Sequence, residues 1–397
     1  MNLRYVFFFI LGLDAISLLL KIDELSISHY EAALLYGELS FLQLLLKVSI
    51  ILFGQNDFAL RLPMLIFHTL SILLVYKISK NYLQIQRNRI WLTIIFILLP
   101  GVMSSAIIVN DAGLILFGLL LFVYIYEKSS NITTYTLLLI YMLISGGFAY
   151  LFISLIVYSI YKKDRNFLLF NITLLLVSLF LYGIDTHGTP KGHLLDSIAI
   201  YAAIFTPIVF VYLFYVLYRR YLTKELDLIW FISFSVLVLS LMLSFRQKVN
   251  LEYLAPYLLI ALPLVAQTFE HSYRVRLKGF RKKYKLTFII SLLFLLVNSS
   301  VIFFNKYLYI IIDKPHKHFS HKLHIAKELA SDLKSDGISC ISSTEKMSDR
   351  LKFYGVTKCN KYILHENNKI YDQSNNVTIS YKDRLVYSAN VTKVNIN

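Results

Sequence analysis

Long apolar runs separated by short polar loops dominate the chain, a pattern that predicts many membrane-crossing helices. A helix needs about 20 mostly apolar residues to cross the hydrocarbon core of a bilayer. The N-terminal run lacks a small-residue cleavage site, so we expect a retained helix rather than a signal peptide. The clear runs lie near residues 3–20, 60–78, 90–107, 112–126, 166–184, 197–218, 226–245, 252–268 and 286–304.

A further apolar stretch, residues 132–161, is too long for one crossing. Gly146 and Gly147 interrupt it, and a glycine pair favours a turn. We therefore expect two short helices that enter and leave on the same side. The sequence predicts a mainly α, polytopic membrane bundle in residues 1–312, with about 11 spanning or re-entrant helices.

The chain becomes polar after Ile312, and residues 313–397 read as a separate domain. The stretch "SHKLHIAKELASDLKSDG" has apolar residues at helical spacing and ends in glycine, which predicts a capped amphipathic helix. Four short β-type segments follow, namely "ISCISS", "KYILHE", "VTISYKD" and "RLVYSANVT". We expect a small α/β domain outside the membrane.

Composition agrees with a membrane protein, since 57% of residues are hydrophobic and only 16% are charged. A soluble domain has about 25% charged residues. The net charge of +16 indicates membrane topology and contact with lipids rather than nucleic-acid binding, because charge alone reports only non-specific affinity.

The basic residues predict the orientation of the chain. They gather in loops that share one side if the spans alternate, most densely in Arg274–Lys285. Loops rich in Lys and Arg stay cytoplasmic. The tail then lies on the opposite face, where its two cysteines, Cys340 and Cys359, could form a disulfide. Two buried thiols are the alternative.

The opposite loops hold the polar groups that could carry chemistry. Acids lie in the first two of these loops, and basic side chains lie in the fourth and fifth. Transfer from a phosphate-linked donor needs both, since cations hold the anionic group while a carboxylate takes a proton from the acceptor. The candidates are Asp23, Glu24, Glu31 and Asp111 as acids, and His187, Lys191, His193, Arg246 and Lys248 as anion binders.

Several segments resemble a known family. "LLLKVSIILFGQNDFALRLP", residues 44–63, resembles bacterial dolichyl-phosphate-mannose-protein mannosyltransferase-like proteins. These belong to the GT-C class of membrane glycosyltransferases, which includes the aminoarabinose transferase acting on lipid A. Later segments resemble the same proteins in the same order: "NDAGLILFGLLLFVYIY", "GHLLDSIAIYAAIFTP", "RQKVNLEYLAPYLLIALPLVA" and "DRLKFYG".

The resemblance implies a GT-C-like fold and an enzyme of a bacterial inner membrane whose active site and tail face the periplasm. It implies transfer of a sugar from a polyprenyl-phosphate donor to a glycolipid, polysaccharide or protein acceptor, by direct displacement with inversion. No cofactor is firmly expected, and the sequence does not require a divalent metal.

The resemblance also assigns roles to residues. An acidic pair opens the family's first outer loop and supplies the catalytic base, and Glu31 stands where the second acid is expected, while Tyr30 holds the place of the first. Glu31 is therefore the predicted base, and Asp23 or Glu24 is the alternative. All three could also be ordinary solvated charges.

We expect Asp111 to orient the acceptor or the sugar, or to cap a helix N-terminus. Arg246 and Lys248 are predicted to hold the donor phosphate, because a guanidinium binds phosphate through two parallel hydrogen bonds and lysine adds a point charge. Contact with lipid headgroups is their alternative. His187, Lys191 and His193 could add to this site or form a solvated loop. We expect Glu31, Asp111 and Arg246 to converge on one cavity.

The remaining polar residues fit less specific roles. Arg61 and Lys47 are expected to anchor segments at the membrane interface. The segment "PHKHFSHKLH" contains four histidines but no acid or cysteine of its own, so we expect no metal there.

Three different functions compete with glycosyl transfer. A transporter or flippase would favour intramembrane charges and two related halves, which the sequence does not display. A non-catalytic scaffold would leave the outer-loop acids and Arg246 replaceable. A ligase or polymerase that uses a diphosphate-linked donor would be an enzyme of the same general class.

Overall fold

The structure is a computed structural model that describes residues 3–183, 192–312, 315, 318–366, 377–382 and 384–393. His187 and Lys191 lie outside the described residues. The chain packs as two units: residues 1–15 with 64–299, and residues 16–63 with 300–397. This division differs from the expected boundary at residue 312, because the first outer loop belongs to the same unit as the tail.

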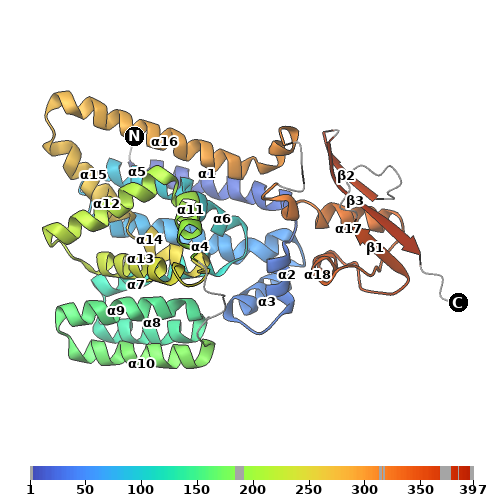
Figure 1. Cartoon of the computed structure of the whole chain (residues 1–397), viewed down its shortest axis with the longest axis horizontal. Helices are drawn as coiled ribbons and strands as arrows, with labels where there is room; N and C mark the ends of the chain where they lie inside the picture. Colours follow the sequence, from blue (N-terminus) through green and yellow to red (C-terminus); the bar gives the residue numbers. More distant parts are fainter. Residues whose placement is uncertain are drawn as a thin grey trace. The chain divides into compact units, whose positions relative to one another are not determined.

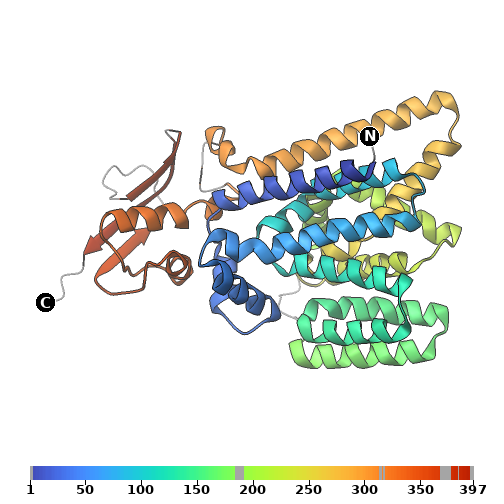
Figure 2. The same cartoon turned by 180° about the vertical axis from the view of Figure 1, so that it is seen from behind.

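The first unit is a bundle of apolar helices. The helices α1 (Leu3–Glu24), α4 (Asp57–Ile78) and α16 (Lys278–Phe303) extend across its boundaries. In both views the green helices α8, α9 and α10 run side by side (Figure 1, Figure 2). The helices wholly inside the unit are α5 (Gln86–Leu98), α6 (Pro100–Ile107), α7 (Asp111–Lys128), α8 (Asn131–Ile144), α9 (Ala149–Lys162), α10 (Arg165–Tyr182), α11 (Leu194–Phe205), α12 (Pro207–Thr223), α13 (Leu228–Ser244), α14 (Leu251–Leu259) and α15 (Leu262–Val275).

Among the described residues, five helical segments are long and apolar enough to cross a membrane, and eight if each bent helix pair counts as one span. The expected mainly α membrane bundle with a small C-terminal sheet is confirmed. The five segments are Leu3–Glu24, Asp57–Asn81, Arg165–Tyr182, Leu251–Val275 and Lys278–Phe303.

Two of the expected single spans are broken at prolines. Residues 197–218 contain α11 and α12, bent by 105°, and residues 90–107 contain α5 and α6, bent by 61°. Proline lacks an N–H and keeps the preceding residue out of the helical region. Leu99 is accordingly extended before Pro100, and Thr206 has φ 67° before Pro207. Each of these two predicted runs is therefore a bent helix pair, which can still count as one span.

The stretch 132–161 forms two helices, α8 and α9, as expected from its glycine pair. A short 3-10 turn, Gly146–Phe148, joins them. A Cβ at Gly147 would lie 2.4 Å from Cδ1 of Ile115 and 3.0 Å from Cδ1 of Tyr253, so a larger residue would require these side chains to shift. The Tyr257 hydroxyl donates to the Gly147 carbonyl at 2.7 Å, which ties the turn to α14.

The second unit joins the first outer loop to the tail. The loop forms α2 (His29–Tyr36) and α3 (Phe41–Phe53), and the tail forms α17 (Ala326–Ser335) and α18 (Glu345–Phe353). Helix α18 packs on α2. Two hydrogen bonds also join the loop to the tail. The Ser26 amide donates to the Leu323 carbonyl at 2.8 Å, and Arg350 Nε donates to the Ile27 carbonyl at 2.9 Å.

The tail also holds a three-stranded antiparallel sheet in the order β1-β3-β2. Three of the four predicted strands are present, as β1 (Tyr362–Glu366), β2 (Val377–Tyr381) and β3 (Arg384–Lys393). Within the described ranges, the segment "ISCISS" forms isolated bridges at Cys340 and Ser342 rather than a strand. Helix α17 lies inside the predicted amphipathic helix, and Gly337 follows it with φ 75°, a backbone conformation that favours glycine.

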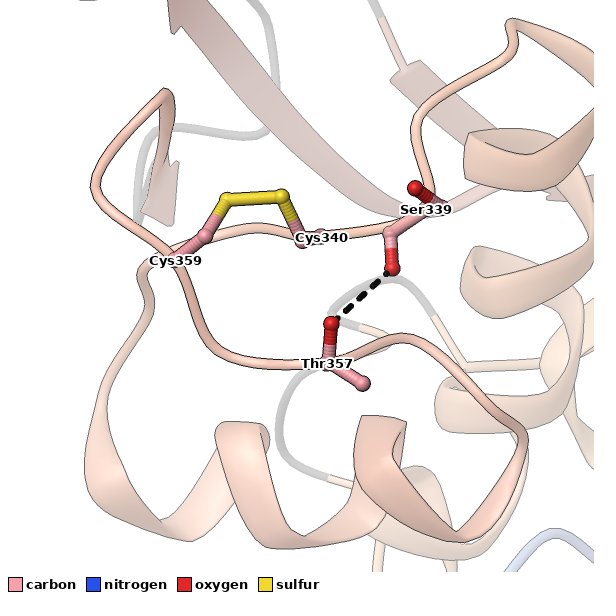
Figure 3. Close-up of a disulfide and its surroundings, with 4 residues drawn as sticks. All are labelled: Ser339, Cys340, Thr357 and Cys359. Carbon is pink, nitrogen blue, oxygen red and sulfur yellow. Dashed lines mark hydrogen bonds between the residues drawn. A yellow bond between two sulfur atoms is a disulfide. The ribbon is translucent and has the colours of Figure 1, made fainter.

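Cys340 and Cys359 form a disulfide, with their Cα atoms 5.4 Å apart (Figure 3). A hydrogen bond from the Thr357 amide to the Ser339 carbonyl, 3.0 Å long, runs beside it. The disulfide therefore closes the segment that contains α18.

Candidate functional site

Helix α2 begins with a capping box, in which the side chains of Ser28 and Glu31 each accept a hydrogen bond from the other residue's backbone amide. The Glu31 amide donates to Ser28 Oγ at 3.2 Å, and the Ser28 amide donates to Glu31 Oε2 at 2.8 Å. This is the Ser-x-x-Glu signature of a helix start. The sequence around Glu31 thus fixes the helix and turns the carboxylate back toward the loop.

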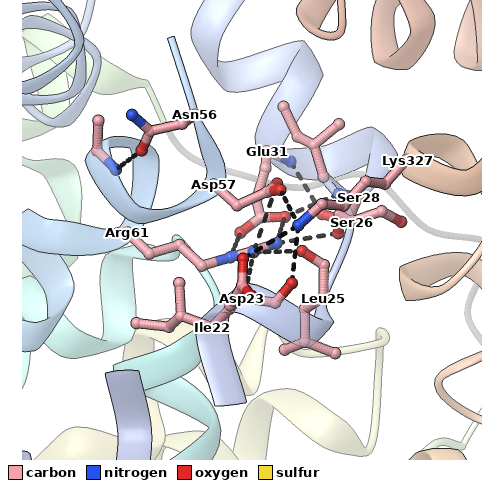
Figure 4. Close-up of polar contacts among 12 residues, drawn as sticks. Ile22, Asp23, Leu25, Ser26, Ser28, Glu31, Asn56, Asp57, Arg61 and Lys327 are labelled. Carbon is pink, nitrogen blue, oxygen red and sulfur yellow. Dashed lines mark hydrogen bonds and ion pairs between the residues drawn. The ribbon is translucent and has the colours of Figure 1, made fainter. Parts of the chain in front are cut away.

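The Glu31 carboxylate is held by Arg61 inside the second unit (Figure 4). Arg61 Nε lies 3.0 Å from Oε1 and Nη2 lies 3.0 Å from Oε2, and both side chains are fully buried. Arg61 also donates to the carbonyls of Leu25 at 2.8 Å and Ser26 at 2.9 Å. The expectation that Arg61 anchors at the membrane interface was wrong, because its guanidinium organises the first loop from within.

This arrangement bears on the predicted base. A general base must come within hydrogen-bond reach of the acceptor hydroxyl. Both Glu31 oxygens already accept hydrogen bonds, and the side chain has no exposed surface. In this structure Glu31 holds the loop in place, and its role as base stays a prediction.

Asp57, the first residue of α4, is a second buried acid in the same unit. The Tyr354 hydroxyl donates to its Oδ1 at 2.6 Å, Lys327 Nζ lies 3.2 Å from Oδ2, and Arg61 Nη1 lies 3.8 Å from Oδ1. An acid in the first turn also complements the helix dipole. Burial, and then the Asp57 charge, raise the pKa of Tyr354, so its hydroxyl remains a donor at neutral pH.

Asp23 is accessible to solvent, unlike the buried acids Glu31 and Asp57. Its side chain is 90% exposed, and Lys327 Nζ lies 3.2 Å from its Oδ1 and 2.8 Å from its carbonyl oxygen. Lys327 therefore bridges Asp23 and Asp57. Glu24, half exposed, accepts from Lys21 Nζ at 2.8 Å. Of the three first-loop acids, Asp23 and Glu24 are open to an acceptor and Glu31 is not.

Asp111 approaches another acid in the first unit. Its amide donates to Glu252 Oε1 at 2.9 Å, and the Tyr253 hydroxyl donates to its Oδ2 at 3.4 Å. The cap of α7 is Asn110, whose side chain accepts from the Gly113 amide at 3.1 Å. The expectation that Asp111 could be the N-cap was therefore wrong, and its carboxylate lies beside the first turn of α14.

The predicted anion binders lie near one another where they are described. Arg246 and Lys248 are exposed in the segment after α13. The His193 amide donates to the Ser244 carbonyl at 2.8 Å, which brings the fourth loop to the end of α13. His193 Nδ1 also lies 3.1 Å from Asp196 Oδ2. The structure thus places His193 beside the segment that carries Arg246.

The expected convergence of the three main residues stays a prediction. Asp111 and Arg246 belong to the first unit, and Glu31 belongs to the second. In the part of the chain that the structure describes, no group of three or more His, Cys, Asp or Glu side chains could hold a metal ion.

The sequence analysis did not identify five residues that contact the predicted acids or one another: Asp57, Arg61, Lys327, Tyr354 and Glu252. Asp57 and Arg61 stand four residues apart, which places both on one helix face and could have marked them as a pair. Lys327, Tyr354 and Glu252 carry no local signal, because each meets its partner across more than 140 residues of chain.

The fold is similar to that of a solved membrane protein. A crystal structure of ArnT from Cupriavidus metallidurans in the apo state superposes with a TM-score of 0.58, over 89% of this chain and 85% of that one, at 12% sequence identity. No family profile matches the chain, and no curated protein matches its sequence. At this identity the likeness establishes the fold and leaves the reaction to be inferred.

Proposed function

We propose that the chain is an integral membrane glycosyltransferase that moves a sugar from a polyprenyl-phosphate donor to a cell-envelope acceptor at the periplasmic face. The observation that carries this proposal is the GT-C-like fold that the chain shares with ArnT along most of its length. The outer-loop acids and the exposed basic residues near His193 support it, because the reaction needs a base and a cation.

The proposed reaction is a single inverting displacement. The acceptor hydroxyl gives its proton to a carboxylate as its oxygen attacks the anomeric carbon. The bond from that carbon to the phosphate oxygen breaks, and the lipid phosphate leaves with the electron pair. Cations stabilise the negative charge that develops on the phosphate.

We assign the base to an exposed acid at the C-terminal end of α1. Asp23 has an exposed carboxylate, and Lys327 fixes its position. Glu31 would need to leave Arg61 and the Ser28 amide before it could accept a proton. We therefore assign Asp23, in the last turn of α1, as the base, with the Glu31–Arg61 pair holding the loop that follows it.

Arg246 and Lys248 are proposed to hold the donor phosphate. Both side chains are exposed, and His193 lies against the same segment. Arg246→Ala should lower both donor affinity and rate, because phosphate contacts exist in the ground state and in the transition state. Arg246→Lys should restore only part of the activity, because the two parallel hydrogen bonds are lost.

Transfer of labelled sugar from polyprenyl phosphate to membrane acceptors tests these roles, with protein level measured by blot. Asp23→Asn should lower the rate roughly 10²–10⁴-fold, the usual contribution of a general base. Asp336→Asn removes another exposed acid of the same unit and serves as the control. Wild-type transfer by Asp23→Asn, with loss by a well-folded Glu31→Gln, would return the base to Glu31.

One observation favours a second function, transport of a lipid-linked sugar. Asp14 and His68 form a buried pair between α1 and α4, with Oδ2 and Nε2 2.8 Å apart. Ionisable pairs inside membrane helices mark proton relays in transporters. If Asp14→Asn abolished flipping of a fluorescent polyprenyl-phosphate sugar in proteoliposomes, while sugar transfer was undetectable in wild type, transport would become the better assignment.

A further inference from the structure

A cavity lined by polar and charged residues lies in the first unit, near the C-terminal ends of α12 and α15. Its volume is about 140 Å³, well above the roughly 10–15 Å³ that one water needs. Arg219 and Arg220 of α12 line it from one side, and Gln267, Thr268 and His271 of α15 line it from the other. None of these residues belongs to the proposed glycosyltransferase site.

The hydrogen bonds of these side chains leave several donors for a ligand. A guanidinium carries five N–H donors, and among the described residues the hydrogen bonds of Arg219 use one, from Nη1 to Ser272 Oγ at 2.9 Å. Arg220 donates to Gln267 Oε1, so the Gln267 amide nitrogen points away from that contact and keeps both its hydrogens. Arginine, amide and hydroxyl donors from two helices therefore border one space.

The charges of the lining favour an anion. Arg220 is partly neutralised, because its Nη1 lies 3.5 Å from Asp227 Oδ2. Arg219 has no ion pair of that kind in the described part of the chain. Glu225 is the one acid among the described residues of the lining, and its side chain is exposed. Arg219 and Arg220 lie near the C-terminus of α12, where basic residues complement the helix dipole. The helix dipole does not explain why Gln267 and Thr268 of α15 line the same cavity.

The surroundings point to a lipid as the source of the anion. On α12, Tyr218, Tyr221 and Leu222 are exposed by 55%, 57% and 60%. Tyrosine side chains gather where a helix leaves the hydrocarbon core, at the level of the headgroups. The chain of α15 continues into the basic run Arg274–Lys285.

We propose that this cavity binds the phosphate of a lipid headgroup, with Arg219 as its main ligand. Arg219 can present two parallel N–H groups to phosphate oxygens, and Gln267 and Thr268 can donate to the remaining ones. The site shares no residue with the proposed catalytic site, so a test of lipid binding here does not depend on the proposed reaction.

Native mass spectrometry of the full chain in a phosphate-free maltoside detergent tests the proposal. The protein is delipidated and titrated with phosphatidylglycerol, with diacylglycerol as the lipid without phosphate and with inorganic phosphate as the free anion. Arg219→Gln removes the main ligand. Arg165→Gln, an exposed arginine outside the cavity lining, removes the same charge and is the matched control.

Wild type and Arg165→Gln should retain phosphatidylglycerol equally, and Arg219→Gln should bind it at least tenfold more weakly, the effect of losing one charge-assisted hydrogen bond. Arg219→Lys should fall between them. Three results would overturn a headgroup site. Wild type could retain diacylglycerol as well as phosphatidylglycerol, or both glutamine variants could lose phosphatidylglycerol to the same extent. Inorganic phosphate could also displace the lipid when present at the same concentration. Matching elution profiles on size exclusion exclude misfolding as the cause.

Discussion

Arg61 binds the Glu31 carboxylate through two nitrogens, each 3.0 Å from a different oxygen, and neither side chain has exposed surface. A buried ion pair of this kind is costly to break, because removal of one partner leaves an uncompensated charge. The pair also joins the start of α2 to the first turns of α4.

Arg61→Ala should lower the free energy of unfolding by about 3–5 kcal/mol, since Glu31 would be left buried without its counter-ion. The double variant Glu31→Ala with Arg61→Ala should lose less than the sum of the two single variants, because the residues are in direct contact. Thermal unfolding in detergent measures the effect. Glu38→Ala, an exposed acid of the same loop, should change stability little. An unchanged midpoint for Arg61→Ala would contradict the role of the pair.

Tyr354→Phe should loosen the contact between the tail and α4. The substitution removes a hydroxyl that donates to Asp57 at 2.6 Å and accepts from the Ile27 amide at 2.9 Å. The Ile27 amide would lose its acceptor, while Asp57 would keep Lys327 and Arg61, so the substitution should cost about 1–3 kcal/mol. Limited proteolysis of the full chain should then cut the tail faster than in wild type. Tyr362→Phe in β1 is the control, and equal cleavage of both variants would count against this contact.

Stability should fall in mild acid because of His324. Burial lowers its pKa to about 3, with further lowering by Lys21, Lys306 and His318, against a small opposing effect of Glu24. His324 is then neutral in the folded protein, whereas the unfolded chain takes up a proton below about pH 6.5. The unfolded state binds more protons between these values, so stability decreases as pH falls through this window.

The expected slope from this one group approaches about 1.4 kcal/mol per pH unit. Urea unfolding at several pH values between about 6.5 and 4 measures it. His324→Gln keeps a donor for Asn305, which His324 Nε2 meets at 3.2 Å, and should flatten the slope. A variant with the wild-type slope would show that another group is responsible.

Loss of the disulfide should destabilise the tail. Cys340 and Cys359 are 19 residues apart, and a loop of that length contributes about 3 kcal/mol in the chain-entropy account. Cys340→Ser with Cys359→Ser should therefore unfold at a lower temperature than wild type. Reduction of wild type by dithiothreitol should produce the same shift, and no shift in either experiment would argue against a structural disulfide.

Orientation can be tested with an impermeant thiol reagent in spheroplasts. Lys361→Cys is exposed in the tail and should be labelled, whereas Lys278→Cys at the start of α16 should be protected until the membrane is permeabilised. The native cysteines are joined and should stay unlabelled. The opposite labelling pattern would invert the topology that the basic loops predict.

The sequence by itself determined the elements, because their causes are local. Apolar runs predicted most helices, the glycine pair Gly146–Gly147 marked the turn between α8 and α9, and Gly337 marked the end of α17. Ser28 and Glu31 are three residues apart, and their capping box needs no other part of the chain. With only two cysteines, one pairing was available.

Tertiary structure alone decided which polar groups meet. Glu31 looked like an open loop acid, but the packing of α4 against the loop buried it on Arg61, 30 residues away. Lys327 reaches Asp23 across 304 residues, and Glu252 reaches Asp111 across 141. Periodicity records which face of one element is buried. It does not record what that face meets, because the partner is set by packing between elements that are distant in the chain.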